Sequence, residues 1–363
     1  MQLRLLFFIL FVICPVFAQD SENTGYLDVN YLRGNILNHA PDINHLITGH
    51  PDGIIFSYNF KTDGEKEWHQ VYNYPDYGFS FMYQDFENEI LGKNYAVSAH
   101  YNFYFLNRNL MLRISQGIGM TTNPYDKETN FKNNALGSKF MSSNYFLLQF
   151  QKQHLIGPIG LQAGLFLTHF SNGRIKTPNR GINTYGINVG LNYNLDEPSV
   201  YKTVDSIPKL TEPLRYNIFF KTGLNENSVV GSGQKPFYHL GGYVDKRIGR
   251  KSALQLGTEL FITQSLKEYI RYRSVAFPEK EYLSPNTDYK RVGVFAGHEL
   301  FINRLSIETQ FGFYVYKPFK EDLDVYQRLG IKYYVTPKVF TGASLKSHGA
   351  KAEAIEFGVG LRL

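Results

Sequence analysis

The chain has 363 residues and a formal net charge of +6, with 43% hydrophobic, 16% aromatic and only 19% charged residues. Lys and Arg are spread along the chain without a basic block, so the charge does not indicate a nucleic-acid partner, and attraction to anionic lipid head groups is the milder interpretation. The single cysteine, Cys14, excludes intramolecular disulfides and a Cys-based metal site in the rest of the chain.

The N-terminus has the features of an export signal. A short basic head ends at Arg4, an apolar run covers 5–17, and small residues precede a cleavage point after Ala18. This order predicts a cleavable signal peptide over 1–18. No later stretch has the ~20 consecutive apolar residues of a spanning helix, so we expect any membrane crossing to be made by strands.

Residues 19–76 form an N-terminal segment that is either periplasmic or supplies the first strands. A short hairpin is expected from 54–61 and 67–73. The part before it, 19–53, fits a periplasmic tail, a plug or an extra strand, and the pattern does not choose among them.

From about Tyr77 the chain divides into long segments in which apolar side chains alternate with small or polar ones. In 304–317, Leu305 and Ile307 fall on one face and Ser306 on the other. Strands of soluble sandwiches average about 5–6 residues, so segments of roughly ten predict transmembrane strands with one face to lipid and one to the lumen. The expected strands are 93–105, 109–121, 143–154, 158–171, 182–195, 213–224, 236–248, 252–264, 288–301, 304–317, 322–335, 338–347 and a last one that ends at Leu363.

The connections alternate in length. Short ones at 106–109, 156–158, 249–251, 303–304 and 336–338 alternate with long polar ones at 122–141, 172–181, 225–235 and 265–287. Outer-membrane barrels have short periplasmic turns and long external loops, so this order predicts a periplasmic C-terminus. The exception is 196–212, a long connection rich in Asp, Glu and Pro on the periplasmic side.

The predicted fold is therefore all-β, an antiparallel transmembrane β-barrel of the outer-membrane type with about fourteen strands, in a range of about 12–16. We expect one barrel over 77–363, with strands at 77–195 and additional strands at 213–363, because a sheet edge left open in lipid is intolerable. A second small barrel after 196–212 is the alternative.

The most informative motif lies at the end of one predicted strand. His169 and Ser171 are two residues apart and continue the apolar row of 158–171, so both point to the lipid-facing side. Asn183 begins the apolar row of the next strand, 182–195. A base and a nucleophile at the outer rim of the lipid-facing wall fit an enzyme that acts on acyl esters better than a channel.

This segment resembles a known family. The sequence His-Phe-Ser-Asn-Gly at 169–173, with Pro-Asn and Gly-Ile before Asn183, is similar to the active-site segment of the lipid A 3-O-deacylases, also described as acyloxyacyl hydrolase-like outer-membrane proteins. The resemblance covers about 30–195 and is sharp over 169–183. Members are small barrels that cleave an ester-linked acyl chain from lipid A with a Ser, a His and a Glu on the outer surface, without a metal or cofactor.

By this resemblance Ser171 is the nucleophile and His169 the base, and Asn172 or Asn179 contributes oxyanion donors. The sequence departs from the family at the acid, because the family's Glu falls on Asn183. An Asn can accept the ring N–H of a His and so orient it, as in Cys-His-Asn proteases, but it lacks the charge that stabilises an imidazolium.

Two carboxylates in the 122–141 loop, Asp126 and Glu128, are the nearest alternatives for the missing acid by topology. Other candidates are weaker. His39, His45 and His50 have no Cys, Asp or Glu at metal-site spacing, so no metal site is predicted. Polar residues on the lumenal parity are expected to satisfy one another inside the barrel; they include His100, Arg113, Gln149, Glu259, Glu308 and Arg362.

The resemblance implies a serine esterase that removes an acyl chain from lipid A in the outer leaflet of a Gram-negative outer membrane, with lipopolysaccharide as its partner and no nucleic acid. The alternative is a catalytically inactive outer-membrane barrel, a pore or a structural protein, that retains the motif as an inherited strand end.

Overall fold

A computed structural model describes residues 25–196, 201–203, 210–278, 283–349 and 351–363. The signal peptide predicted over 1–18 lies outside these residues. The strands are β1 (Gly25–Ile36), β2 (Asp52–Phe60), β3 (Asp76–Asp85), β4 (Lys93–Phe105), β5 (Leu110–Thr121), β6 (Phe140–Ile156), β7 (Ile159–Ser171), β8 (Ile182–Asn194), β9 (Arg215–Asn225), β10 (Lys235–Arg247), β11 (Ser252–Thr263), β12 (Arg291–Ile302), β13 (Leu305–Tyr316), β14 (Val325–Tyr334), β15 (Val339–His348) and β16 (Lys351–Arg362). The helices are η2 (Pro41–Leu46), α2 (Glu67–Val71) and α3 (Gln264–Ala276).

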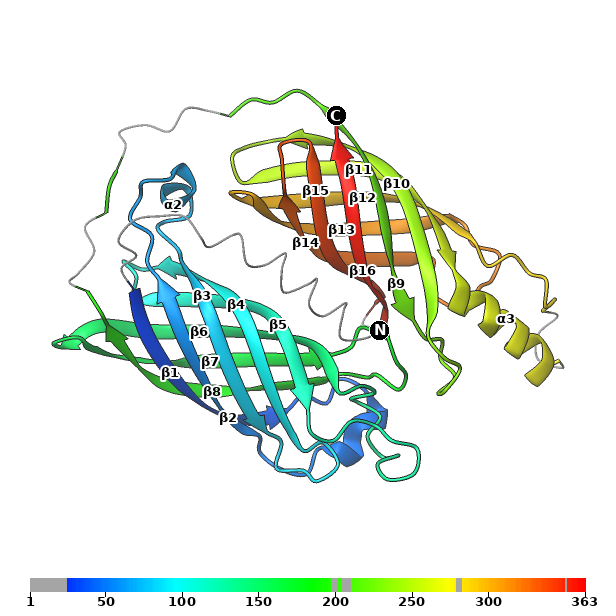
Figure 1. Ribbon diagram of the computed structural model, residues 1–363, viewed down its shortest axis with the longest axis horizontal. Helices are drawn as coiled ribbons and strands as arrows, with labels where there is room; N and C mark the ends of the chain where they lie inside the picture. Colours follow the sequence, from blue (N-terminus) through cyan, green and yellow to red (C-terminus); the bar gives the residue numbers. More distant parts are fainter. Residues whose placement is uncertain (1–24, 197–200, 204–209, 279–282, 350) are drawn as a thin grey trace.

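These strands close two antiparallel barrels, β1 to β8 and β9 to β16 (Figure 1). In the first, β1 pairs with β8 from Tyr26 opposite Asn194 to Ile36 opposite Thr184. In the second, β16 pairs with β9. The all-β barrel class is confirmed, and the expectation of one barrel over 77–363 is wrong. The physical requirement that no edge stays open is met twice, once on each side of the 196–212 connection.

The strands predicted after Tyr77 are found with small shifts at their ends, and the errors lie before it. Residues 25–36 form β1, the extra strand among the alternatives for 19–53. Of the expected hairpin, 54–61 corresponds to β2, but 67–73 falls on α2. Without β1 the first half of the chain lacks the strand that pairs with β8, and this is why a single large barrel looked necessary.

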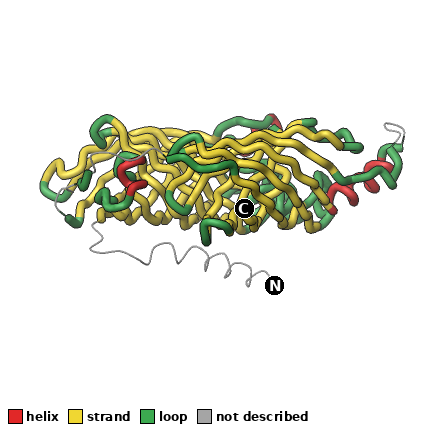
Figure 2. Tube along the Cα trace, turned by 90° about the horizontal axis from the view of Figure 1, so that it is seen from above, coloured by secondary structure: helices red, strands yellow, loops and turns green. Residues whose placement is uncertain are grey.

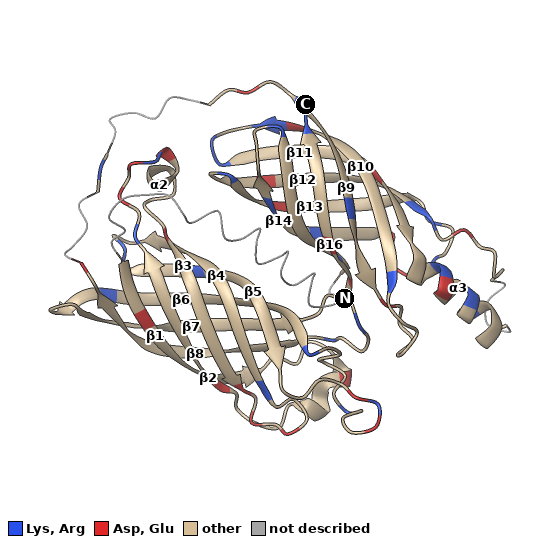
Figure 3. Ribbon diagram, in the orientation of Figure 1, with Lys and Arg blue, Asp and Glu red and all other residues tan. Residues whose placement is uncertain are grey.

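The two faces of each sheet differ as the alternation predicts. The outer walls carry exposed apolar side chains such as Leu165 and Ile187, which are 59% and 60% exposed. The lumens hold paired polar groups: in the first barrel Arg113 Nη2 lies 2.6 Å from Asp28 Oδ2, and in the second Arg328 Nη2 lies 2.8 Å from Glu259 Oε2. The expected mutual satisfaction of lumenal residues is confirmed. Figure 3 shows further charged residues in the connections at the barrel ends.

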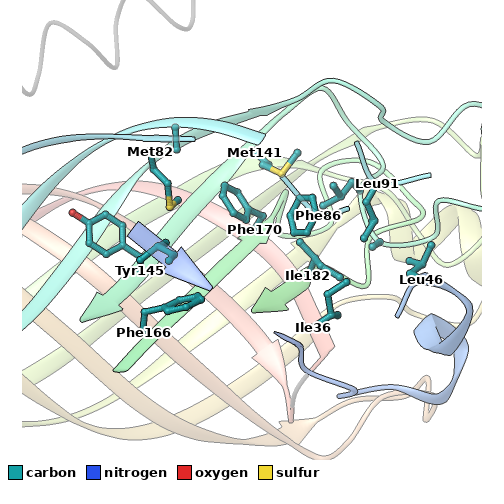
Figure 4. Close-up of a cluster of buried hydrophobic side chains, with 14 of the residues drawn as sticks. Ile36, Leu46, Met82, Phe86, Leu91, Met141, Tyr145, Phe166, Phe170 and Ile182 are labelled. Carbon is teal, nitrogen blue, oxygen red and sulfur yellow. The ribbon is translucent and has the colours of Figure 1, made fainter. Parts of the chain in front are cut away.

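An apolar cluster fills the loop end of the first barrel (Figure 4). It includes Phe86, Phe166, Phe170 and Ile182, which are at most 4% exposed. Phe170 and Ile182 come from the last turns of β7 and the first of β8, so this cluster fixes the two strand ends at which the predicted site lies.

The two barrels lie side by side (Figures 1 and 2) and touch at both ends. At the short-turn end, Tyr72 Oη donates to the carbonyl of Phe301 at 2.6 Å. At the long-loop end, the 172–181 connection bonds to the connection between β9 and β10. Within the part of the chain that is described, no helix has the length and apolar character needed to cross a membrane.

Candidate active site

His169 and Ser171 point outward from the first barrel. Phe170 between them is fully buried in the lumenal cluster (Figure 4), and side chains alternate between the faces of a strand. His169 continues the exposed row of β7 that contains Leu165 and Leu167 and is itself partly exposed, whereas Ser171 is only 8% exposed under the following loop. The predicted parity of the pair is therefore the one observed.

Asn183 lies directly opposite His169 in the pairing of β7 with β8. Its Oδ1 is 2.6 Å from His169 Nδ1. An amide oxygen only accepts, so the imidazole carries its proton on Nδ1, and Nε2 keeps a free lone pair. The contact expected between the family's acid position and the histidine is thus present, with an amide in place of a carboxylate.

Ser171 Oγ accepts two hydrogen bonds, from the backbone N–H of Gly173 at 3.1 Å and from Asn179 Nδ2 at 2.9 Å. A hydroxyl has two acceptor positions and one proton, so the proton remains for a third partner. Among the described residues Ser171 and His169 form no direct hydrogen bond. The arrangement needs a small rotation of one side chain before a proton can pass, as is common in unliganded sites.

Gly181 shows that the two side chains border one small space. A Cβ on Gly181 would lie 3.2 Å from His169 Cε1 and 3.3 Å from Ser171 Cβ. The backbone there has φ of +72°, a region that favours glycine. Glycine at this position therefore leaves room between the imidazole and the hydroxyl.

The two predicted oxyanion residues have different surroundings. Asn172 is 3% exposed, and its amide donates to Ser138 Oγ and to the carbonyl of Lys176, both at 2.9 Å. Its backbone N–H donates to Asn179 Oδ1 at 3.0 Å. The donors of Asn172 are thus committed to holding the loop. Asn179 places one amide hydrogen on Ser171 Oγ and has a second one, so it fits the donor role better.

The alternative acids do not reach the histidine. Asp126 Oδ1 accepts the backbone N–H groups of Glu128 and Thr129 at 2.9 Å in its own turn. Glu128 is 78% exposed in its side chain, with Lys127 as a partner at 3.9 Å. Within the described part of the chain, neither carboxylate bonds to His169, and Asn183 holds the acid's place.

Sequence reasoning missed the role of His39. Its Nδ1 lies 3.2 Å from Asn183 Nδ2, on the far side of the amide from His169. The backbone N–H of Leu37 also donates to the carbonyl of Asn183 at 2.9 Å. Recognition of β1 as the partner of β8 would have placed 37–39 beside the start of β8.

A second missed residue is Glu226, which is 3% exposed in the connection that follows β9. Its Oε2 accepts the backbone N–H of Thr177 at 2.7 Å, and its own N–H donates to the carbonyl of Arg174 at 3.0 Å. Thr177 Oγ1 donates to the carbonyl of Asn227 at 2.9 Å. The loop that carries Asn179 is therefore held by the second barrel, a contact between distant segments that no local motif announces.

No group of three or more His, Cys, Asp or Glu suited to a metal ion occurs among the residues that are described. The other two N-terminal histidines have hydrogen-bond partners of their own. His45 Nε2 lies 2.7 Å from the carbonyl of Lys132, and His50 Nδ1 lies 2.7 Å from Asn35 Oδ1.

Comparisons with known proteins match both barrels. Residues 52–192 match the family model described as lipid A 3-O-deacylase (PagL), and residues 214–363 match the model described as the C-terminal domain of acyloxyacyl hydrolase. No curated protein matches the chain.

Two solved structures illustrate the remaining similarity. A mutant of the Rh. blastica porin has 9% identity over 94% of this chain and 99% of that chain, with a TM-score of 0.19. The outer membrane protein Omp33 of Acinetobacter baumannii has 10% identity over the same shares, with a TM-score of 0.18. Scores this low carry no argument about the architecture described above.

Proposed function

Since the chain belongs to the lipid A 3-O-deacylase family, we propose that it is an outer-membrane serine esterase that removes an ester-linked acyl chain from lipid A. The observation that carries this proposal is the grouping of Ser171, His169 and Asn183 on the apolar outer wall of the first barrel. A soluble hydrolase buries its triad in a cleft, whereas an enzyme for a membrane lipid needs it where acyl chains lie.

The reaction follows from the donor and acceptor pattern. His169 Nε2 takes the proton of Ser171 Oγ as that oxygen attacks the ester carbonyl of a lipid lying against the wall. The second amide hydrogen of Asn179 donates to the oxyanion that develops. The imidazolium then protonates the departing sugar oxygen, and the acyl chain stays on Ser171 as an ester.

Deacylation repeats these roles with water. His169 removes a proton from a water molecule that attacks the acyl-serine carbonyl, and the fatty acid leaves as Ser171 recovers its proton. Throughout, Asn183 keeps the imidazole proton on Nδ1, which preserves Nε2 as the base. Because an amide stabilises the imidazolium less than a carboxylate does, we expect slow turnover.

The same proposal gives a location and a partner. The apolar outer walls of both barrels face lipid, and the long connections, including 172–181, lie at the outer leaflet where lipopolysaccharide is found. A signal peptide over 1–18 delivers the chain to the outer membrane of a Gram-negative cell. No metal or cofactor takes part in the proposed steps.

Mass spectrometry of lipid A tests the proposal. Cells that express the wild type should release lipid A lacking one ester-linked acyl chain, and cells that express Ser171→Ala should not. Ser142→Ala is the matched control, because Ser142 lies opposite Ser171 on β6 and is partly exposed. Identical acylation in the wild type and in Ser171→Ala would overturn the proposal.

A further inference from the structure

His39 belongs to a hydrogen-bonded chain that ends at the proposed base. His39 Nε2 lies 3.1 Å from the carbonyl of Arg180, and its Nδ1 lies 3.2 Å from Asn183 Nδ2 and 3.1 Å from the carbonyl of Leu37. Asn183 Oδ1 then meets His169 Nδ1. The amide thus lies between two imidazoles.

Only one assignment of protons satisfies most of these contacts. With the proton of His39 on Nε2, that nitrogen donates to the carbonyl of Arg180 and Nδ1 accepts from Asn183 Nδ2. With the proton on Nδ1, the bare Nε2 would face the Arg180 carbonyl and the N–H would face the Asn183 amide nitrogen. Two of the contacts would then be repulsive.

The orientation of the Asn183 amide decides what His169 can do. With Oδ1 toward His169, that imidazole carries its proton on Nδ1 and Nε2 is a base. If the amide turned over, Nδ2 would face His169, whose proton would move to Nε2. That tautomer cannot accept the proton of Ser171. A carboxylate has two equivalent acceptors and needs no such control, but an amide does.

We propose that His39 is a positioning residue that holds the Asn183 amide in the orientation required for His169 to act as the base. This inference rests on the proposed esterase function. It assigns the work of the family's carboxylate to an Asn and a His together, with the second imidazole supplied from the segment after β1.

The neighbouring backbone keeps His39 in place. The Leu37 N–H bonds to the Asn183 carbonyl at 2.9 Å, which ties this segment to β8. The Arg180 N–H donates to the carbonyl of Asn134 at 3.1 Å, and its side chain pairs with Asp42 at 2.5 Å. The carbonyl that receives His39 Nε2–H is therefore fixed from two sides.

The test compares His39 variants in two backgrounds, with turnover of lipid A measured on purified, folded full-length protein. In the wild-type background, His39→Ala should lower kcat roughly tenfold, the effect of losing one orienting hydrogen bond. His39→Gln should recover part of the loss, because its amide oxygen can accept from Asn183 Nδ2. His45→Ala, in the same N-terminal region, is the control that should leave kcat unchanged.

The second background is Asn183→Asp, in which either carboxylate oxygen can accept from His169. There, His39→Ala should change kcat less than about twofold, since no amide remains to be oriented. An equal loss in both backgrounds would mark His39 as merely structural and overturn the inference, as would full activity of His39→Ala in the wild-type background. A wild type that leaves lipid A intact would instead overturn the esterase function itself.

Discussion

Glu226 of the second barrel accepts the backbone N–H of Thr177 in the first barrel at 2.7 Å. Its other oxygen accepts the N–H of Gly233 at 2.8 Å, so one buried carboxylate joins the two long loops. Arg174 Nη2 adds a bond of 2.7 Å to Ser228 Oγ. A Cβ on Gly173, two residues after Ser171, would lie 2.2 Å from Ile355 Cγ1 of β16. The second barrel thus supports the loop that follows the proposed nucleophile.

We predict that Glu226→Gln loosens this loop. Gln keeps one acceptor but turns an NH₂ toward the second backbone N–H, and a buried donor left without an acceptor costs about 1–3 kcal/mol. Trypsin should cleave faster after Arg174, and lipid A turnover should fall severalfold. Glu128→Gln, in an exposed loop, is the control. Unchanged cleavage and turnover in Glu226→Gln would show that the second barrel does not support the site.

Much of the fold could be predicted from periodicity. The last strand alternates Ile355, Phe357 and Val359 with Glu356 and Gly358, and such segments need no tertiary information to be recognised. β1 was missed because its lumenal row includes Asp28 and Asn30, whose partners Arg113 and Gln149 lie far away in sequence. With β1 unseen, closure into two barrels could not be inferred.

The site divides in the same way. His169, Ser171 and Asn183 follow from strand parity and from the resemblance, because neighbouring antiparallel strands bring them together. His39 and Glu226 reach the site only through barrel closure and through contact between barrels. Neither residue has a local signal, and their roles depend on hydrogen-bond geometry that a sequence does not contain.

We predict that Gly181→Ala lowers turnover at least tenfold. The added methyl would lie within 3.3 Å of both His169 Cε1 and Ser171 Cβ, where it would separate the base from the nucleophile. Gly231→Ala is a matched control, since Gly231 has a similar φ of +79° with nothing within 4 Å of a Cβ. Equal effects of the two substitutions on kcat would mean that backbone strain alone, and not the space between the side chains, matters.

Asn183→Asp should raise kcat by about 10- to 100-fold. A hydrogen bond to a charged acceptor is worth about 1.5–3 kcal/mol, against about 1 kcal/mol for a neutral one, and the carboxylate also stabilises the imidazolium that forms in each step. Initial rates of fatty-acid release by the purified variant measure this. A decrease in kcat with folding intact would contradict the role given to Asn183.

The alternative function as a pore makes an opposite prediction to ours. Eight strands enclose an interior only wide enough for side chains to fill it. The second lumen holds buried ion pairs, including Lys332 with Glu299 at 2.9 Å and Arg328 with Glu356 at 2.6 Å. We therefore expect no steady single-channel conductance in planar bilayers. Discrete conductance steps from purified protein would favour the pore.

The central claim is that Ser171 is a nucleophile activated by His169 on the outer wall. A long-chain alkyl fluorophosphonate tests it directly, because the serine oxygen forms a bond to phosphorus as fluoride leaves, and peptide mass spectrometry locates the adduct. We predict one adduct on Ser171 in the wild type, strongly reduced labelling in His169→Ala, and none at this peptide in Ser171→Ala. An adduct on another residue, or equal labelling with and without His169, would contradict the account.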